Sequence, residues 1–260
     1  MKMQNYIWYP INLANVPIEI KKTFNLDDSL VDNYIIKKDN NEKLVEITKN
    51  DNILISPFWE DEEKFEIKDK ELKEIIELEW KLLKNYVEKN DFGIYVRESV
   101  YYRLKEVNNY LKLNWYQISI KIWYRPLEVQ HKLFDDILKY IKNKFPELNY
   151  DTHYQIICDY VSDPNNFTPP HSTWGAVDIQ LLDTNLNPVD MWSPLNYPWE
   201  QSNITFTKLE KHQIKNRWFL QDTMLMFGFA NLATEWWHFS YGDPKWAYFY
   251  GYSESLYNKI

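Results

Sequence analysis

Four stretches of the chain repeat apolar residues at spacings of three and four, with charged residues between them. That spacing places the apolar side chains on one face of an α-helix. The pattern therefore predicts helices over residues 68–89, 99–111, 126–143 and 211–227. Pro126 suits the first turn of its helix, because the N–H that proline lacks has no helical partner there.

A different pattern, in which apolar residues occupy every second position, predicts strands. Ile118, Ile120 and Ile122 follow it within residues 115–124, so that stretch predicts a strand with one buried face. Three further strands are predicted from apolar or alternating aromatic content, over residues 174–182, 229–241 and 246–252, the last pairing with the one before it. Strands and helices in this order indicate an α+β fold.

The first 60 residues carry the weakest pattern. Two prolines interrupt an apolar stretch, which favours extended segments or loops. Residues 33–38 and 43–48 resemble strands on either side of a polar turn, so we expect a β-hairpin there. We predict an N-terminal extension over 1–60, packed on a main domain over 61–260. A lid or a dimer contact is the open alternative for its role.

Composition narrows the class of protein. Hydrophobic residues form 45% of the 260 positions, enough for a full core, and the 17% of aromatic residues can line clefts for small ligands. The formal net charge of −8 argues against a nucleic-acid partner, because phosphate binding needs a basic face. Cys158 is the one cysteine, so no disulfide within the chain is possible.

The N-terminal sequence has neither the apolar core nor the small-residue cleavage site of a signal peptide. No stretch approaches the roughly 20 apolar residues that span a bilayer. We therefore expect a cytoplasmic protein with no membrane partner, and its oligomeric state stays open.

Two short stretches hold the residue types of a metal site: His171 to Asp178, and Glu235 to His238. A catalytic zinc ion takes three ligands from the protein, and a nearby carboxylate serves as general base. We predict His171, Asp178 and His238 as ligands of one zinc ion per chain, with Glu235 as the base. A single histidine is more often structural, but Asp178 lies in an apolar strand, where an unpaired carboxylate is costly. Iron or cobalt would also suit these ligands.

Arg125 directly follows the strand predicted over residues 115–124, and strand ends are where a rigid scaffold presents functional side chains. A surface charge or a helix-flanking ion pair is the ordinary alternative for such an arginine. Beside a metal, its guanidinium could polarise a carbonyl and hold a developing oxyanion. We predict the catalytic role because the residues of a metal site are also present.

These residues carry a family resemblance. His171-x6-Asp178, Glu235-Trp-Trp-His238 and Trp123-Tyr-Arg-Pro126 resemble motifs of the zinc-dependent D-alanyl-D-alanine dipeptidases of vancomycin resistance, within the wider family of DD-carboxypeptidases, dipeptidases and phage endolysins. The resemblance implies hydrolysis of small D-amino-acid dipeptides such as D-Ala-D-Ala, with Arg125 stabilising the transition state. It also implies a zinc DD-peptidase (Hedgehog/DD-peptidase-like) fold, an antiparallel sheet with helices packed on one side, and makes 61–260 the catalytic domain.

Three positions depart from the family pattern, and all three concern the substrate. Pro169 stands where the family has serine, and Trp174 displaces a glycine by one position to Gly175. Asn196 aligns with the acid that holds the substrate's ammonium group. The hydrolytic chemistry is expected to be retained, while the identity of the dipeptide stays open. The predicted substrate-binding residues are Asn196, Ser172 and Trp237.

Two alternative functions stay open. A DD-carboxypeptidase or other peptidoglycan-peptide hydrolase would use the same chemistry, but it should need an exported chain and an open groove. A non-catalytic zinc-binding interaction module would need neither Glu235 nor Arg125. We therefore favour a zinc dipeptidase whose partner is a small peptide substrate.

Overall fold

The helices and strands follow one another along the whole described part of the chain. The computed structural model describes residues 31, 34–56, 70–90, 93–158, 161–195, 197 and 200–260. Its elements are β1 (Leu44–Glu46), η2 (Lys49–Asp51), β2 (Leu54–Ile55), α3 (Lys70–Asn90), β3 (Tyr95–Arg97), α4 (Glu98–Leu113), β4 (Gln117–Ile122), α5 (Leu127–Lys144), α6 (Tyr150–Cys158), η5 (Pro170–Thr173), β5 (Ala176–Leu182), η6 (Glu200–Ser202), α7 (Lys211–Met226), β6 (Ala230–Leu232), β7 (Glu235–Ser240) and α8 (Pro244–Tyr250).

Five strands form one sheet in the order β2-β4-β5-β7-β6, in which β2 runs parallel to β4 and the other pairs are antiparallel. β1 and β3 form a separate antiparallel pair. The central strand β5 is buried along its whole length. Because successive side chains of a strand point to opposite faces, β5 presents Val177, Ile179 and Leu181 to one face and Asp178 to the other.

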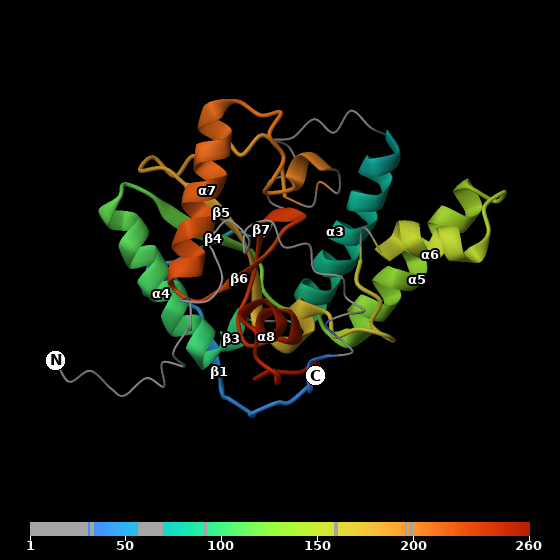
Figure 1. Cartoon of the computed structure of the whole chain (residues 1–260), viewed down its shortest axis with the longest axis horizontal. Coiled ribbons are helices and arrows are strands. Elements are labelled where there is room, and N and C mark those ends of the chain that lie inside the picture. Colours follow the sequence, from blue (N-terminus) through green and yellow to red (C-terminus); the bar gives the residue numbers. More distant parts are fainter. Residues whose placement is uncertain are drawn as a thin grey trace.

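The main core lies between the sheet and the helices α4 and α7, which stand on one side of it (Figure 1). The apolar residues of these helices recur at the helical spacing read from the sequence, and they pack on the apolar face of β5. Fully buried side chains of this core include Val100, Leu104, Val107, Leu220 and Met224. The α+β class predicted from the pattern is confirmed.

Helices α3 and α5 lie on the other side of the sheet (Figure 1). The predicted arrangement had helices on one side only, so these two helices form a second layer that it did not include. Residues two positions apart on a strand normally share a face, but the register of β4 shifts between Ile120 and Ile122. Ile120 therefore belongs to the main core, whereas Ile122 packs with Leu83 and Val129 on the other side of the sheet. Apolar contacts therefore hold α3 and α5 against the sheet face that carries Asp178.

The predicted last strand, residues 246–252, is wrong, because most of this stretch forms the helix α8. Asp243 caps that helix by accepting a hydrogen bond from the backbone N–H of Trp246 at 2.7 Å, and Pro244 occupies its first position. Gly251 ends the helix with φ 73°. The alternating aromatic residues imitate a strand, but the start and stop signals around them belong to a helix.

The predicted hairpin over residues 33–38 and 43–48 is also wrong. β1 pairs with β3, while Ile36 makes an isolated bridge to Glu254 near the end of the chain. The polar turn between the two stretches forms as expected, with Asp39 accepting from the backbone N–H of Asn41 at 2.7 Å. Local turn chemistry was therefore readable, whereas the choice of strand partner was made by distant parts of the chain.

Residues 44–46 and 54–55 thus pair with strands of the main domain, and β2 forms an edge of the large sheet. The boundary between an extension over 1–60 and a domain over 61–260 stays a prediction. Within the described residues, no helix has both the length and the apolar character needed to cross a membrane.

Candidate metal centre

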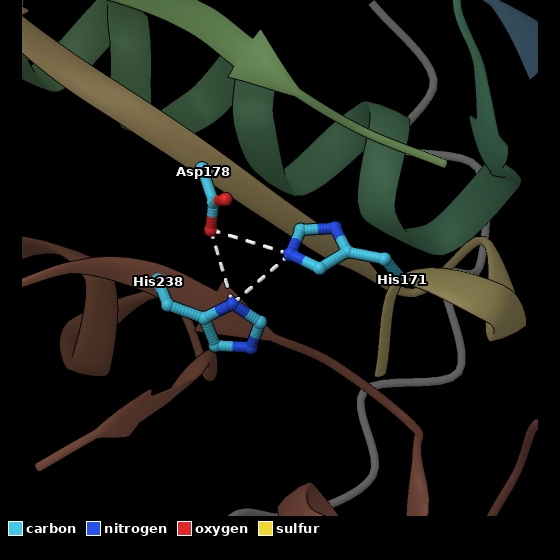
Figure 2. A group of neighbouring side chains, drawn as sticks. All are labelled: His171, Asp178 and His238. Carbon is cyan, nitrogen blue, oxygen red and sulfur yellow. Dashed lines mark hydrogen bonds and ion pairs between the residues drawn. The ribbon is translucent and has the colours of Figure 1, made fainter. Parts of the chain in front are cut away.

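Three separate elements carry the predicted ligands. His171 lies in the short turn η5, Asp178 in β5 and His238 in β7. Asp178 and His238 are direct partners across the β5–β7 ladder, so their side chains leave the sheet on the same face. The turn η5 ends two residues before β5 and brings His171 over that face (Figure 2).

The three ligand atoms converge on one point, as Figure 2 shows. Nε2 of His171 lies 3.2 Å from Nδ1 of His238 and 3.3 Å from Oδ1 of Asp178, and His238 Nδ1 lies 3.0 Å from the same oxygen. In a tetrahedral zinc site, with ligands at about 2.0–2.1 Å from the ion, ligand atoms lie roughly 3.3 Å apart. The donor types and their spacing therefore fit one zinc ion, which would satisfy all three atoms at once.

Glu235 lies at the edge of this cluster, three residues before His238 on β7. Its Oε2 is 4.0 Å from Nδ1 of His238. The Glu235 side chain is 33% exposed, whereas those of the three predicted ligands are 4–9% exposed. A buried triad with a partly buried carboxylate at its rim is an arrangement that suits metal ligands beside a general base.

The surroundings shift the pKa values of the two acidic groups of the site in opposite directions. Burial opposes the ionisation of Asp178, but the His171 and His238 imidazoles hold the pKa of this carboxyl below its usual range. Burial raises the pKa of Glu235 to about 7, against the opposing charge of His238 and with the help of the Asp178 carboxylate. With pKa values so far apart, Asp178 is suited to remain ionised beside a cation, and Glu235 is suited to exchange a proton.

Arg125 is joined to the ligand turn through the backbone. Its N–H donates to the carbonyl oxygen of His171 at 3.1 Å, and the hydroxyl of Ser172 donates to the carbonyl oxygen of Arg125 at 2.7 Å. The guanidinium is buried and held from two helices: Nη2 donates to Oε1 of Glu79 on α3 at 2.6 Å, and Nη1 donates to Oε1 of Gln130 on α5 at 3.0 Å. The end of β4 therefore presents a fixed arginine next to His171.

Glu79 was missed in the sequence. It is the counter-ion of Arg125, and burial raises its pKa while the Arg125 charge opposes the rise. Glu79 also contributes to the electrostatic environment of Glu235 and Asp178. Its signal was an acidic residue inside the apolar stripe of the predicted helix, next to Leu78 and four positions before Leu83.

The predicted substrate-binding residues are placed as follows. Ser172 is fully buried, and its hydroxyl is bonded to the backbone of Arg125. Trp237 is buried beside Trp236, with the two rings at nearly right angles. Asn196 lies outside the described residues. A role in substrate binding stays a prediction for all three.

Trp174 and Gly175 connect the turn that carries His171 to β5. Trp174 adopts the left-handed conformation, with φ 63°, and its ring stacks on that of Tyr124 at a centroid distance of 3.4 Å. Gly175 is required at the next position, because a Cβ atom there would lie 2.5 Å from the carbonyl oxygen of Tyr241. The aromatic stack and the close backbone approach together fix the path of the chain from His171 to Asp178.

The fold and the site define an α+β protein with a candidate metal centre made of two histidines and one aspartate. Comparison with known families gives the class: the family Peptidase_M15, described as D-ala-D-ala dipeptidase, matches residues 76–257. The chain belongs to this family, and the resemblance seen in the motifs is confirmed.

A curated relative, the D-alanyl-D-alanine dipeptidase of a Synechocystis species, is 31% identical over an alignment of 158 residues; the match covers 53% of this chain and 64% of the relative. The chain thus spans slightly less than two thirds of that relative's length.

Among solved structures, the zinc-bound vancomycin-resistance D,D-pentapeptidase VanY from a VanB-type cassette has a TM-score of 0.36 at 15% identity, over 63% of this chain and 83% of its own. The LD-carboxypeptidase LdcB has a TM-score of 0.41 at 16% identity, over 84% of this chain and 77% of its own.

Proposed function

We propose that this chain is a zinc metallopeptidase that hydrolyses the peptide bond of small D-amino-acid dipeptides such as D-Ala-D-Ala. The observation that carries the proposal is the convergence of His171, Asp178 and His238 at 3.0–3.3 Å, with Glu235 at its rim, in a member of the D-Ala-D-Ala dipeptidase family. The cytoplasmic location and the absence of a nucleic-acid or membrane partner stay predictions from the sequence.

The residues of the chain divide the chemistry between them. His171, Asp178 and His238 would hold the zinc ion, which when bound acts as a Lewis acid and lowers the pKa of water towards about 7. Glu235 accepts the proton of the attacking water and transfers it to the leaving amine. Arg125, fixed by Glu79 and Gln130, offers its guanidinium to the negative charge that develops on the carbonyl oxygen.

The test is hydrolysis of a panel of dipeptides by zinc-loaded protein: D-Ala-D-Ala, D-Ala-Gly, L-Ala-D-Ala and L-Ala-L-Ala. We expect turnover of D-Ala-D-Ala that stops on removal of zinc with a chelator and returns when zinc is added. Turnover of another dipeptide alone would change the substrate and keep the mechanism. Zinc-loaded protein that cleaves only longer peptidoglycan peptides would favour the carboxypeptidase alternative, and one that cleaves neither would favour a binding module.

The ion pair between Glu79 and Arg125 leads to a second expectation. Glu79→Gln keeps a hydrogen-bond acceptor but removes the charge that holds the guanidinium, so kcat should fall by about 10-fold with little change in KM, because the oxyanion forms only in the transition state. The matched control is Glu74→Gln on the same helix, whose carboxylate accepts from Tyr140 and does not contact Arg125. An unchanged or increased kcat for Glu79→Gln would show that Glu79 does not position Arg125 productively.

A further inference from the structure

One buried arginine, Arg97, donates hydrogen bonds to the turn that carries His171. Arg97, at the end of β3, donates its backbone N–H to the carbonyl oxygen of Trp174 at 3.0 Å. Its side-chain Nε donates to the carbonyl oxygen of Thr173 at 3.1 Å. These two bonds are made to the second and third residues after His171, and Arg97 is 2% exposed, so water does not compete for them.

The rest of the Arg97 guanidinium faces the N-terminal part of the chain. Nη1 donates to the carbonyl oxygen of Glu42 at 3.0 Å, and Nη2 forms an ion pair with Oδ2 of Asp39 at 2.6 Å. The guanidinium also lies over the ring of Tyr257, 4.8 Å from its centroid. One side chain thus joins the ligand turn to residues 39–42 and to the C-terminal part of the chain.

Residues 39–42 also accept hydrogen bonds from the C-terminal part of the chain and from the first turn of α4. Oδ2 of Asp39 also accepts from the backbone N–H of Asn258 at 3.3 Å. The carboxylate of Glu42 accepts from the Tyr257 hydroxyl at 2.7 Å and from the backbone N–H of Ser99. This segment lies outside residues 76–257, the part of the chain that matches the family.

The buried charge makes these contacts interdependent. A buried guanidinium is tolerated only where its donors are bonded and its charge is compensated, and here Asp39 provides the compensating charge. The position of Arg97, and with it the position of carbonyl oxygens 173 and 174, therefore depends on the N-terminal segment. A small displacement of that turn would move Nε2 of His171 away from the other two ligand atoms.

We propose that Arg97 is a positioning residue for His171, and that residues 39–42 complete the zinc site through it although they lie outside the family match. The inference rests on the proposed function in so far as His171 is a zinc ligand.

The experiment measures zinc affinity by competition with a chelator, in the absence of substrate, for the full chain and for Arg97→Lys, Asp39→Asn and the double variant. Lysine keeps the charge but cannot make the separate bonds to Thr173, Glu42 and Asp39. We expect the zinc dissociation constant of Arg97→Lys to rise by about 10-fold, as for other residues that orient metal ligands. Asp39→Asn should show a smaller loss, and the double variant no more than Arg97→Lys alone, because both act through one contact.

The matched control is Arg217→Lys on α7. Arg217 is equally buried, and it donates to the carbonyl oxygens of Met191, Gln201 and Asn203, none of which belongs to the His171 turn. Both arginine variants should lower the thermal midpoint, but only Arg97→Lys should weaken zinc binding and change the visible spectrum of the cobalt-substituted protein. That spectrum reports the ligand geometry directly.

The proposal is overturned if Arg97→Lys lowers the thermal midpoint as Arg217→Lys does while zinc affinity and the cobalt spectrum match those of the wild type. Wild-type protein that binds zinc but hydrolyses no peptide would refute the proposed function alone, because the affinity comparison remains valid. Folded wild-type protein that binds no zinc would refute both.

Discussion

Glu235→Gln is expected to lower kcat by about 1,000-fold, within the range that general acid–base catalysis contributes. Glutamine fills the same volume but cannot accept the proton of the attacking water. Because the Glu235 carboxylate lies 4.0 Å from Nδ1 of His238 and does not belong to the three predicted ligands, the variant should still bind one zinc ion. Steady-state kinetics on D-Ala-D-Ala, together with the zinc content of the purified variant, measures both effects.

Glu254→Gln serves as the control for this variant, since Glu254 forms a surface ion pair with Lys38 and should be kinetically silent. Near-normal turnover by zinc-loaded Glu235→Gln would remove Glu235 from its assigned role. Loss of zinc together with loss of activity would instead make Glu235 a ligand, and the assignment of three ligands and one base would have to be redrawn.

Asp178→Asn is expected to weaken zinc binding by at least about 100-fold, more than the loss typical of residues that only orient a ligand. The substitution keeps the shape of the side chain but replaces an anion by a neutral amide at the centre of the triad. Activity should fall with zinc occupancy, and a large excess of zinc should restore part of it. Zinc titration followed by chelator competition gives the affinity, and activity measured at each zinc concentration gives the link between the two.

Asp163→Asn is a suitable comparison, because Asp163 is another buried carboxylate, bonded to Tyr154 and Asn166 and not to the triad. It should cost stability without changing zinc affinity. Equal zinc affinity for Asp178→Asn and wild type would exclude Asp178 as a ligand and leave its burial between two histidines to be explained as a structural ion pair.

Much of the fold was readable because its signals are local. The helices α3, α4, α5 and α7 follow from apolar spacing, and β4 and β5 from runs of β-branched and other apolar residues. Pairing was less predictable, since a hairpin expected from a polar turn gave way to the β1–β3 pair, whose strands lie far apart in the sequence. At α8, alternating aromatic residues were misleading, although Asp243 and Pro244 already carried the signal for a helix start.

The sequence by itself determined which residue types are available at the site: a carboxylate in an apolar strand at Asp178, and Glu235 and His238 three positions apart. These are properties of short segments, and local physics is sufficient to recognise them. Only the tertiary structure decided that His171 lies within 3.3 Å of the other two predicted ligands, that Glu79 from α3 forms an ion pair with Arg125, and that Arg97 joins the His171 turn to Asp39. Such contacts join segments that are remote along the chain, and their geometry depends on how complete helices and strands pack, which no local pattern encodes.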